Sequence, residues 1–192
     1  MSLVNDSSQA DLHADDDSRW PLDQDGYPHR RAARALLIGP GSRVLLVRGH
    51  DQDDAAHTWW FTVGGGIESG EDARDAAIRE IREETGVHLS RERLSGPVLT
   101  RHATFHFARS TRKQDEVFFL AYLDPDEANH VGEGTQLTEA EKHVLDEFGF
   151  FTPDQIDALV ESGTAVYPAE IAVYVRMWSN GWDGRMLSIS ED

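Results

Sequence analysis

The 192-residue sequence contains no cysteine. This absence excludes a disulfide framework, a thiolate nucleophile and a zinc site built on cysteine. The sequence also has no apolar run near the ~18 residues that a membrane-spanning helix needs. At the start of the sequence, no positively charged segment followed by an apolar one marks a signal peptide. We therefore expect a cytoplasmic protein with no membrane partner.

Basic residues are scarce. Lysine and arginine total 18 against 35 aspartates and glutamates, which gives a formal net charge of −17. Nucleic-acid-binding proteins obtain most of their affinity by neutralising phosphates with lysine and arginine. The charge balance therefore argues against a nucleic-acid polymer as a partner. A small phosphorylated molecule is compatible with it, provided that a metal ion supplies positive charge.

Acidic residues are concentrated at the N-terminus. Within the first 28 residues, seven aspartates accompany a single arginine or lysine, Arg19. This composition is typical of a solvated segment without a packed core. We predict a disordered acidic tail over residues 1–30, a single domain over residues 31–185, and a short C-terminal tail over residues 186–192.

The remaining hydrophobic pattern predicts strands interleaved with few helices. Residues 31–39 and 43–49 are predicted as two strands of a hairpin or meander. The other predicted strands are residues 59–61, 96–109, 115–123 and 143–151, and the predicted helices are residues 72–85, 153–163 and 168–180. Loops are predicted over residues 50–57 and 125–142, with a turn around Ser110–Gln114. This order predicts an α/β fold, in which helices cover both faces of a mixed β-sheet.

The helix predicted over residues 72–85 carries three glutamates near its C-terminal end, Glu80, Glu83 and Glu84. Carboxylates at this spacing repel one another, and the negative end of the helix dipole adds a further penalty. A solvated charged face would place them opposite the apolar stripe of the helix. At ~100° per residue they instead overlap the stripe formed by the alanines and Ile81. We therefore predict carboxylates at the edge of a core, in need of a partner.

Too few cations lie near these carboxylates in the sequence to neutralise them together with Glu71, and Arg79 is the main candidate. A divalent ion would supply the missing positive charge. Several carboxylate oxygens without a softer ligand suit Mg²⁺ or Mn²⁺, which often share their coordination with substrate phosphates. The cluster therefore predicts a Mg²⁺ or Mn²⁺ cofactor.

The residues from 65 to 87 follow a known pattern. Gly65, five residues, Glu71, seven residues and then Arg-Glu-Ile-Arg-Glu-Glu-Thr-Gly-Val fill every fixed position. This stretch resembles the Nudix box, and the order of elements around it is similar to the Nudix fold, an α/β/α sandwich. One departure is Val63, where family members commonly have a proline. The resemblance implies a divalent-metal-dependent hydrolase in which water attacks the diphosphate of a nucleoside diphosphate linked to another moiety.

The resemblance also implies roles for individual residues of the box. Glu80, Glu83 and Glu84 correspond to the metal-binding glutamates of the family. Arg79 corresponds to the arginine that orients a glutamate through a salt bridge. Glu71 corresponds to an auxiliary or orienting carboxylate before the helix. All five residues are therefore predicted to be catalytic.

Catalysis also requires a carboxylate that accepts a proton from the attacking water. In the Nudix family this base is sometimes a glutamate of the box and sometimes one from a downstream loop. Here the downstream candidates are Glu139 and Glu141, of which we prefer Glu141. The alternative is that both residues merely begin an exposed helix or loop.

Residues outside the carboxylate cluster would select the substrate. Gly65 and Gly66 are expected to allow a close approach of the loop to the helix and the metals. Trp59 and Trp60 are candidates for stacking on a base, and of the two we assign Trp60 to the site. Arg48 and His106 are candidates for phosphate contacts. The alternatives are that one or both tryptophans pack in the core and that the histidine lies on an exposed strand face.

The preferred substrate stays open among nucleotide sugars, ADP-ribose-like molecules and nucleoside triphosphates. The sequence after the box lacks the proline typical of ADP-ribose pyrophosphatases and the tyrosine typical of diadenosine polyphosphate hydrolases. An alternative function is a nucleotide-sensing domain without turnover, although such domains often lack box glutamates. We expect a monomer or a homodimer.

Overall fold

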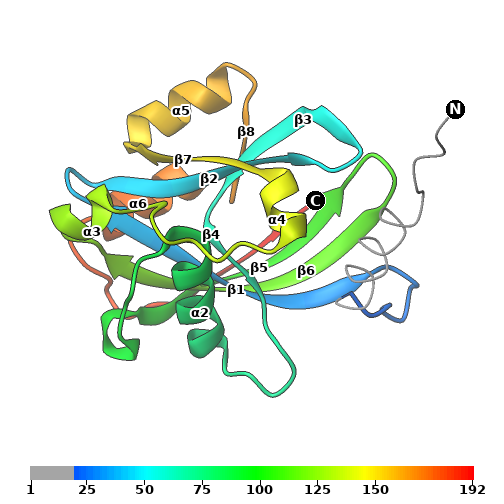
Figure 1. Ribbon diagram of the computed structural model, residues 1–192, viewed down its shortest axis with the longest axis horizontal. Coiled ribbons are helices and arrows are strands. Elements are labelled where there is room, and N and C mark those ends of the chain that lie inside the picture. Colours follow the sequence, from blue (N-terminus) through cyan, green and yellow to red (C-terminus); the bar gives the residue numbers. More distant parts are fainter. Residues whose placement is uncertain (1–19) are drawn as a thin grey trace, which may run out of the picture.

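The computed structural model describes residues 20–192, apart from the side chain of Ala140. Over this range, nine strands form one mixed sheet with helices on both faces (Figure 1). The strands are β1 (His29–Gly39), β2 (Arg43–Asp51), β3 (Asp54–Phe61), β4 (Val63–Gly66), β5 (Ser95–His106), β6 (Thr111–Tyr122), β7 (Leu145–Phe151), β8 (Ala165–Tyr167) and β9 (Leu187–Glu191). The helices are α2 (Ala73–Thr85), α3 (Pro125–Asn129), α4 (Glu139–Val144), α5 (Pro153–Glu161) and α6 (Ile171–Trp178), with a 3₁₀ turn η1 (Arg91–Arg93). The predicted α/β/α architecture is confirmed.

The sheet is built around a parallel pair of strands. Its order is β8-β3-β2-β1-β6-β5-β9, with β4 paired to β1 and β7 paired to β2. Strands β1 and β6 run parallel from the pair His29↔Lys113 onward. Strands β1 and β2 form the predicted antiparallel pair only next to their turn, after which β2 pairs with β3 and β7. This divergence allows β4 to bring residues 64–66 alongside β1.

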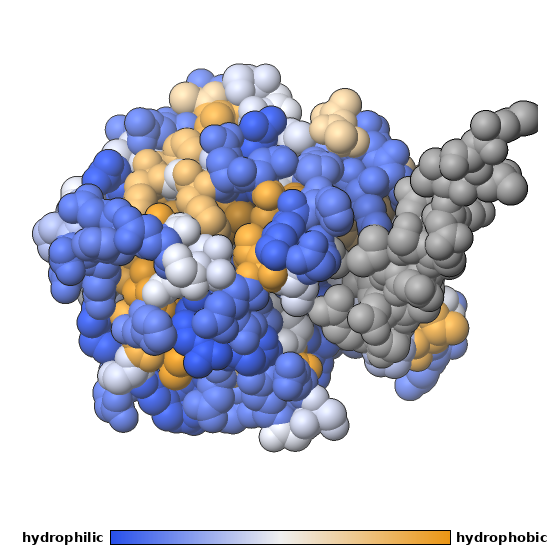
Figure 2. Space-filling view, in the orientation of Figure 1, coloured by the Kyte–Doolittle hydropathy of each residue, from blue (hydrophilic) through white to orange (hydrophobic). Residues whose placement is uncertain are grey.

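Two apolar clusters hold the three layers together. On one face of the sheet, Ile156 of α5 and Trp178 of α6 are buried against the strands. On the other face, Ala77 and Ile81 of α2 are buried against β1, β2 and β6. Because β1 and β6 are covered on both faces, they read as nearly continuous apolar runs. Figure 2 shows that hydrophilic residues dominate the outer surface of the face viewed in Figure 1, with apolar residues gathered toward its middle.

Helix α2 begins and ends where the sequence predicts. The Asp72 side chain caps its N-terminus by accepting a hydrogen bond from the backbone N–H of Arg74, at 3.0 Å. At the other end, Gly86 adopts a left-handed conformation with φ 75° and donates its N–H to the carbonyl of Arg82. Both features are standard helix boundaries. They fix which residues α2 turns toward the sheet.

The end of α2 also holds the loop that leads to α4. The backbone N–H of Gly132 donates to the carbonyl of Thr85 at 2.9 Å, and that of Gln136 donates to the carbonyl of Glu83 at 2.7 Å. These bonds satisfy carbonyls that have no partner within the helix. The position of α4 is therefore tied to the end of α2.

Replacing Gly86 by alanine is expected to destabilise the fold strongly. Its left-handed φ alone costs an L-residue about 1 to 2 kcal/mol. In addition, an alanine Cβ would lie 1.8 Å from the carbonyl oxygen of Glu133. Gly163 is a matched control because it has φ 89° and open space around it. Urea unfolding should show a clearly larger loss of stability for Gly86→Ala than for Gly163→Ala, and equal losses would contradict the close approach.

Several predicted boundaries differ from the structure. The segment 125–142, predicted as a loop, contains α3 and most of α4, which ends at Val144; each helix has a capping box. These short polar helices lack the apolar periodicity that reveals a helix in a sequence. Residues 50–57 belong largely to β2 and β3, the turn after β5 lies at 107–110, and the last helix begins at Ile171. None of the helices in the described range is long and apolar enough to cross a membrane.

The N-terminal boundary of the packed region lies earlier than predicted. Of the segment 1–30 predicted as a tail, residues 29 and 30 belong to β1 and residues 20–28 are attached to the sheet at a few points, while the rest lies outside the described residues. Trp20 is buried, with the guanidinium of Arg30 4.0 Å from its ring centroid. Lys113 of β6 pairs with Asp23 at 2.9 Å. An aromatic anchor and an ion pair therefore hold this acidic stretch in place.

The C-terminal segment 186–192 also differs from its prediction as a tail. It contains β9, which runs parallel to β5 and pairs with it from Leu99↔Leu187 onward. Leu187 and Ile189 pack against the same apolar cluster as α5 and α6. The alternating pattern of this strand is only five residues long, which is too short to predict a strand from the sequence.

Candidate active site

A cavity of about 1330 Å³ is bordered by α2, β3, β5 and α4. Nine of the eleven residues predicted for the site line it. They are Gly65, Gly66, Glu71, Arg79, Glu80, Glu83, Glu84, His106 and Glu141. The remaining two, Trp60 and Arg48, lie elsewhere. The fold thus gathers residues from distant parts of the chain around one space.

The glutamates of α2 form the most buried acidic part of this cavity. Glu80 and Glu84 are 6% and 4% exposed, whereas Glu83 is half-buried. The predicted overlap of the carboxylates with the apolar face of the helix is confirmed. Burial raises the pKa of Glu84 to about 8, with a further contribution from the charge of Glu80. Burial also raises the pKa of Glu80, although Arg79 opposes this effect.

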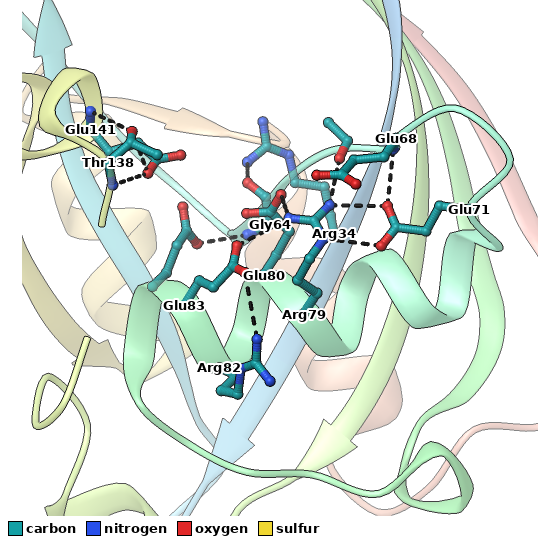
Figure 3. Close-up of polar contacts among 12 residues, drawn as sticks. Arg34, Gly64, Glu68, Glu71, Arg79, Glu80, Arg82, Glu83, Thr138 and Glu141 are labelled. Atoms are coloured by element: carbon teal, nitrogen blue, oxygen red, sulfur yellow. Dashed lines mark hydrogen bonds and ion pairs between the residues drawn. The ribbon is translucent and has the colours of Figure 1, made fainter. Parts of the chain in front are cut away.

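Arg79 is the cation at the centre of the cluster (Figure 3). Its Nε and Nη2 donate to the two oxygens of Glu71, each at 3.0 Å. Its Nη1 donates to Glu80 Oε1 at 2.7 Å and to Glu83 Oε2 at 3.1 Å. Nη2 also donates to the carbonyl of Gly66 at 2.9 Å. The hydrogen bonds from Arg79 lower the pKa of Glu71, so one guanidinium orients three carboxylates and the glycine loop.

Glu84 is held from the opposite side, by β4. The backbone N–H of Gly64 donates to Glu84 Oε2 at 2.8 Å. Arg34 of β1 donates from Nη1 to the carbonyls of Gly64 and Thr62, at 2.8 and 3.1 Å. Arg34 Nε in turn donates to Glu116 Oε1 at 2.8 Å. A buried arginine that the sequence analysis did not single out thus fixes the strand segment that holds Glu84.

The Arg34 network continues across the sheet. Arg101 of β5 places Nε 2.9 Å from Glu116 Oε2 and Nη1 3.1 Å from Glu191 Oε2. The sequence contains a signal for this network, because charged residues within apolar strands require partners when they are buried. The sequence does not show which residues pair, because the pairs join strands that are distant in the chain.

Glu141 lies across the cavity from α2 (Figure 3). Its Oε2 accepts hydrogen bonds from the backbone N–H and the Oγ1 of Thr138, at 2.8 and 2.7 Å, which completes the capping box of α4. The charge of Glu141 contributes to the raised pKa of Glu80 and of Glu84. Glu139, the other downstream candidate, does not line the cavity. Glu141 therefore caps a helix and faces the acidic cluster at the same time.

Two residues predicted to bind substrate lie away from the cavity. Trp60 is 8% exposed and packs edge-on against Phe151 in the core beneath α5 and α6, with 4.7 Å between ring centroids. Arg48 Nη1 lies 3.1 Å from Glu147 Oε1 of the neighbouring strand β7. Of the two tryptophans in β3, Trp59 is the one that lines the cavity, as does Phe61 two residues later. Successive residues of a strand face opposite sides, so only one tryptophan of the pair can do so.

Aromatic side chains line the part of the cavity formed by β3 and β5. The ring of Trp59 lies edge-on to that of Phe107, with centroids 5.8 Å apart, and Phe105 lies 6.1 Å from Phe107. His106 is also part of this wall, with Nδ1 3.3 Å from Thr111 Oγ1. The cavity therefore combines an acidic wall with an aromatic wall.

The acidic wall fits a hard divalent cation. Its donors are carboxylate oxygens of Glu80, Glu83 and Glu84, the ligand type that Mg²⁺ and Mn²⁺ prefer. Arg79 is engaged by three carboxylates. The hydrogen bond that Glu84 accepts comes instead from an uncharged group, the backbone N–H of Gly64. Burial and the charge of Glu80 raise the pKa of Glu84 to about 8. Additional positive charge near Glu84 would therefore stabilise its ionised form.

Comparison with known proteins identifies relatives of the chain. A family model of the NUDIX domain matches residues 28–169. Nudix hydrolase 26, a chloroplastic protein of Arabidopsis thaliana, is 31% identical over 165 residues, which cover 78% of this chain and 70% of that protein. An RNA pyrophosphohydrolase of Sphingopyxis alaskensis is 42% identical over 67 residues. That match spans only 35% of this chain and 40% of the relative.

Solved structures share the fold. The chain resembles a MutT NUDIX hydrolase from Burkholderia pseudomallei at 19% identity, with a TM-score of 0.51 over 76% of this chain and 96% of that one. It resembles a MutT protein from Methanosarcina mazei at 19% identity, with a TM-score of 0.52 over 79% and 93%. At 19% identity these structures support the fold alone. Family membership is supported by the family model and the Arabidopsis relative, each of which covers most of the sequence. The chain therefore belongs to the Nudix hydrolase family.

Proposed function

We propose that the chain is a divalent-metal-dependent pyrophosphohydrolase that cleaves the diphosphate of a small nucleotide. The observation that carries this proposal is the convergence of Glu80, Glu83 and Glu84 around Arg79 on one wall of a cavity. These three glutamates would hold Mg²⁺ or Mn²⁺. Such a cation neutralises phosphate charge, lowers the pKa of water and orients it for attack on phosphorus.

The other residues of the site would position these groups and move a proton. Arg79 and Glu71 form a two-bond ion pair that keeps the arginine in place beneath the metal-binding carboxylates. Glu141 is our candidate to accept a proton from the attacking water, because it faces the acidic cluster and Thr138 orients its carboxylate. General bases of this kind accelerate reactions by about 10² to 10⁴-fold.

The aromatic wall supports a nucleotide as the substrate. Trp59 and Phe107 offer rings for a base or another flat moiety, so Trp59 is the stacking candidate of the two tryptophans. A cavity of about 1330 Å³ has room for a nucleoside, a diphosphate and a second moiety. The net charge of −17 favours small substrates over RNA. A cytoplasmic location and a monomeric or homodimeric state remain predictions.

A substrate panel tests this proposal. The purified chain would be incubated with nucleoside triphosphates, nucleotide sugars, ADP-ribose, dinucleoside polyphosphates and a 5′-triphosphorylated RNA. Each reaction would contain Mg²⁺, Mn²⁺ or EDTA, and products would be separated by ion-exchange chromatography. We expect cleavage of a phosphoric anhydride in at least one small nucleotide, and only with metal.

The panel also separates the alternatives. A nucleotide that raises the melting temperature without forming product, in a panel that yields no cleavage, would support a nucleotide-sensing domain instead. A clear preference for the RNA would contradict the assignment of small substrates. Cleavage that persists in EDTA would contradict the metal requirement.

A further inference from the structure

We propose that His29, His102 and Asp115 form a second metal site, one that takes a transition metal such as Zn²⁺ and is separate from the glutamate cluster. None of the three residues lines the main cavity. His102 and Asp115 are cross-strand partners in β5 and β6, and their neighbours Arg101 and Glu116 face the cavity instead. At this cross-strand position the alternation of side chains turns His102 and Asp115 away from the side on which Arg101 and Glu116 line the cavity.

The geometry brings three ligand groups together. Asp115 Oδ2 lies 3.0 Å from His29 Nε2, and Asp115 Oδ1 contacts His102 Nδ1. One ligand atom from each residue lies within 4.8 Å of the other two. Ligand atoms around a single Zn²⁺ lie up to roughly 4 Å apart, since each bond is about 2.0 to 2.2 Å long. Small side-chain rotations, above all of the exposed His102, would bring the ligand atoms to this spacing.

One nitrogen of the cluster is poorly satisfied by the protein alone. His29 Nε2 is inaccessible to solvent and has no hydrogen-bond partner of suitable geometry in the described part of the chain, despite its ionic contact with Asp115. Buried polar atoms are normally satisfied. A cation shared with the carboxylate would use the lone pair of this nitrogen.

The strands hold the ligands in place before any metal arrives. β1 and β6 are paired in parallel from His29↔Lys113 onward, and β5 and β6 are paired antiparallel through His102↔Asp115. The nearest positive charge along β6, that of Lys113, is balanced by Asp23 and Asp25 at 2.9 and 3.2 Å. Little backbone ordering is therefore required for binding.

The ligand types distinguish this site from the glutamate cluster. Two imidazoles and one carboxylate suit Zn²⁺ and other borderline metals, whereas an all-oxygen cluster suits Mg²⁺ and Mn²⁺. Three protein ligands also leave a coordination position for water or for a group from a binding partner. Excess Mg²⁺ should consequently occupy the glutamates without competing at the histidines.

Calorimetric titration of the untagged full-length chain with Zn²⁺, in excess Mg²⁺, tests the proposal. We expect one equivalent to bind, both in the wild type and in Glu84→Gln, which disables the glutamate cluster. His102→Ala should weaken this binding by ~10-fold or more. His88→Ala, which removes an exposed histidine outside the cluster, should leave it unchanged. Circular dichroism would confirm that each variant is folded.

A second metal, Co²⁺, and a second variant, Asp115→Asn, test whether the metal is bound by these residues. Co²⁺ bound by two imidazoles and a carboxylate should give visible absorption bands that disappear in Asp115→Asn, a substitution that preserves side-chain shape. Zn²⁺ binding that is absent in the wild type would overturn the proposal. So would binding that is lost in Glu84→Gln but retained in both His102→Ala and Asp115→Asn.

Discussion

Replacing Glu84 by glutamine is expected to reduce metal-dependent turnover by about 100-fold or more while the fold is retained. Enzymes lose turnover on this scale when one group that stabilises charge in the transition state is removed. The glutamine oxygen can still accept the hydrogen bond that Gly64 donates to Glu84 Oε2 at 2.8 Å. Packing is therefore preserved, and the change removes one negative charge from the proposed metal site. Steady-state kinetics over a range of Mg²⁺ concentrations would measure the loss. Turnover close to that of the wild type would exclude Glu84 from the site.

The same substitution should change how stability depends on pH in the metal-free protein. Burial and the charge of Glu80 raise the pKa of Glu84 from 4.5 to about 8 in the folded state. Between these values the native protein holds a proton that the unfolded chain releases, so stability falls as pH rises through this window. Glutamine cannot ionise, and the variant should show a weaker fall, with the remaining dependence arising partly from Glu80.

Thermal unfolding in EDTA at pH 5 and pH 8.5 would measure this effect. We expect the melting temperature of Glu84→Gln to exceed that of the wild type at the higher pH, and the difference to shrink at the lower pH. Glu161→Gln is a suitable control because it makes the same chemical change at an exposed position outside the cavity. An equal pH dependence in wild type and Glu84→Gln would contradict the burial of an ionisable group at this position.

The sequence predicted α2 well because its signals are local. Asp72 and Gly86 mark the helix ends, and both act within one turn of the residues that they cap. The 3.6-residue period then determines which side chains share the buried face. The burial of Glu80 and Glu84 follows from that period and from the position of Ile81.

The faces of β3 could not be assigned in the same way. Alternation predicts that Trp59 and Trp60 point in opposite directions, but it does not say which direction leads to the cavity. Both directions are apolar here, since one meets Phe151 and the other meets Phe107. Only the position of β3 between β2 and β8 decides that Trp60 belongs to the core.

Contacts between distant strands lay beyond the reach of sequence patterns. Arg34 and Glu116 are 82 residues apart, yet they form a hydrogen bond across the parallel pair β1 and β6. A lone charge in an apolar strand indicates a buried partner without identifying it. For the same reason Arg48 was predicted to contact phosphate, although its partner is Glu147 of β7.

Replacing Gly65 by alanine is expected to lower metal-dependent turnover by ~10-fold or more, because the added methyl group would displace the carboxylate of Glu80. The φ of Gly65 does not lie in the left-handed region, so the backbone itself tolerates alanine. An added Cβ would, however, lie 2.6 Å from Glu80 Cδ and Oε1. The carboxylate would have to move, which would disturb its hydrogen bond from Arg79 Nη1 at 2.7 Å.

Gly66→Ala provides the matched control, because it adds the same methyl group one residue away. Its nearest neighbour would be Arg30 Nη1 at 3.5 Å, an ordinary contact. Titration of activity with Mg²⁺ should therefore show a higher metal requirement for Gly65→Ala and a nearly unchanged one for Gly66→Ala. Equal behaviour of the two variants would mean that turnover does not depend on where the Glu80 carboxylate lies. A defect found only in Gly65→Ala would instead support a role for the Glu80 carboxylate in metal binding. The nearest atoms that the added methyl group would meet all belong to Glu80.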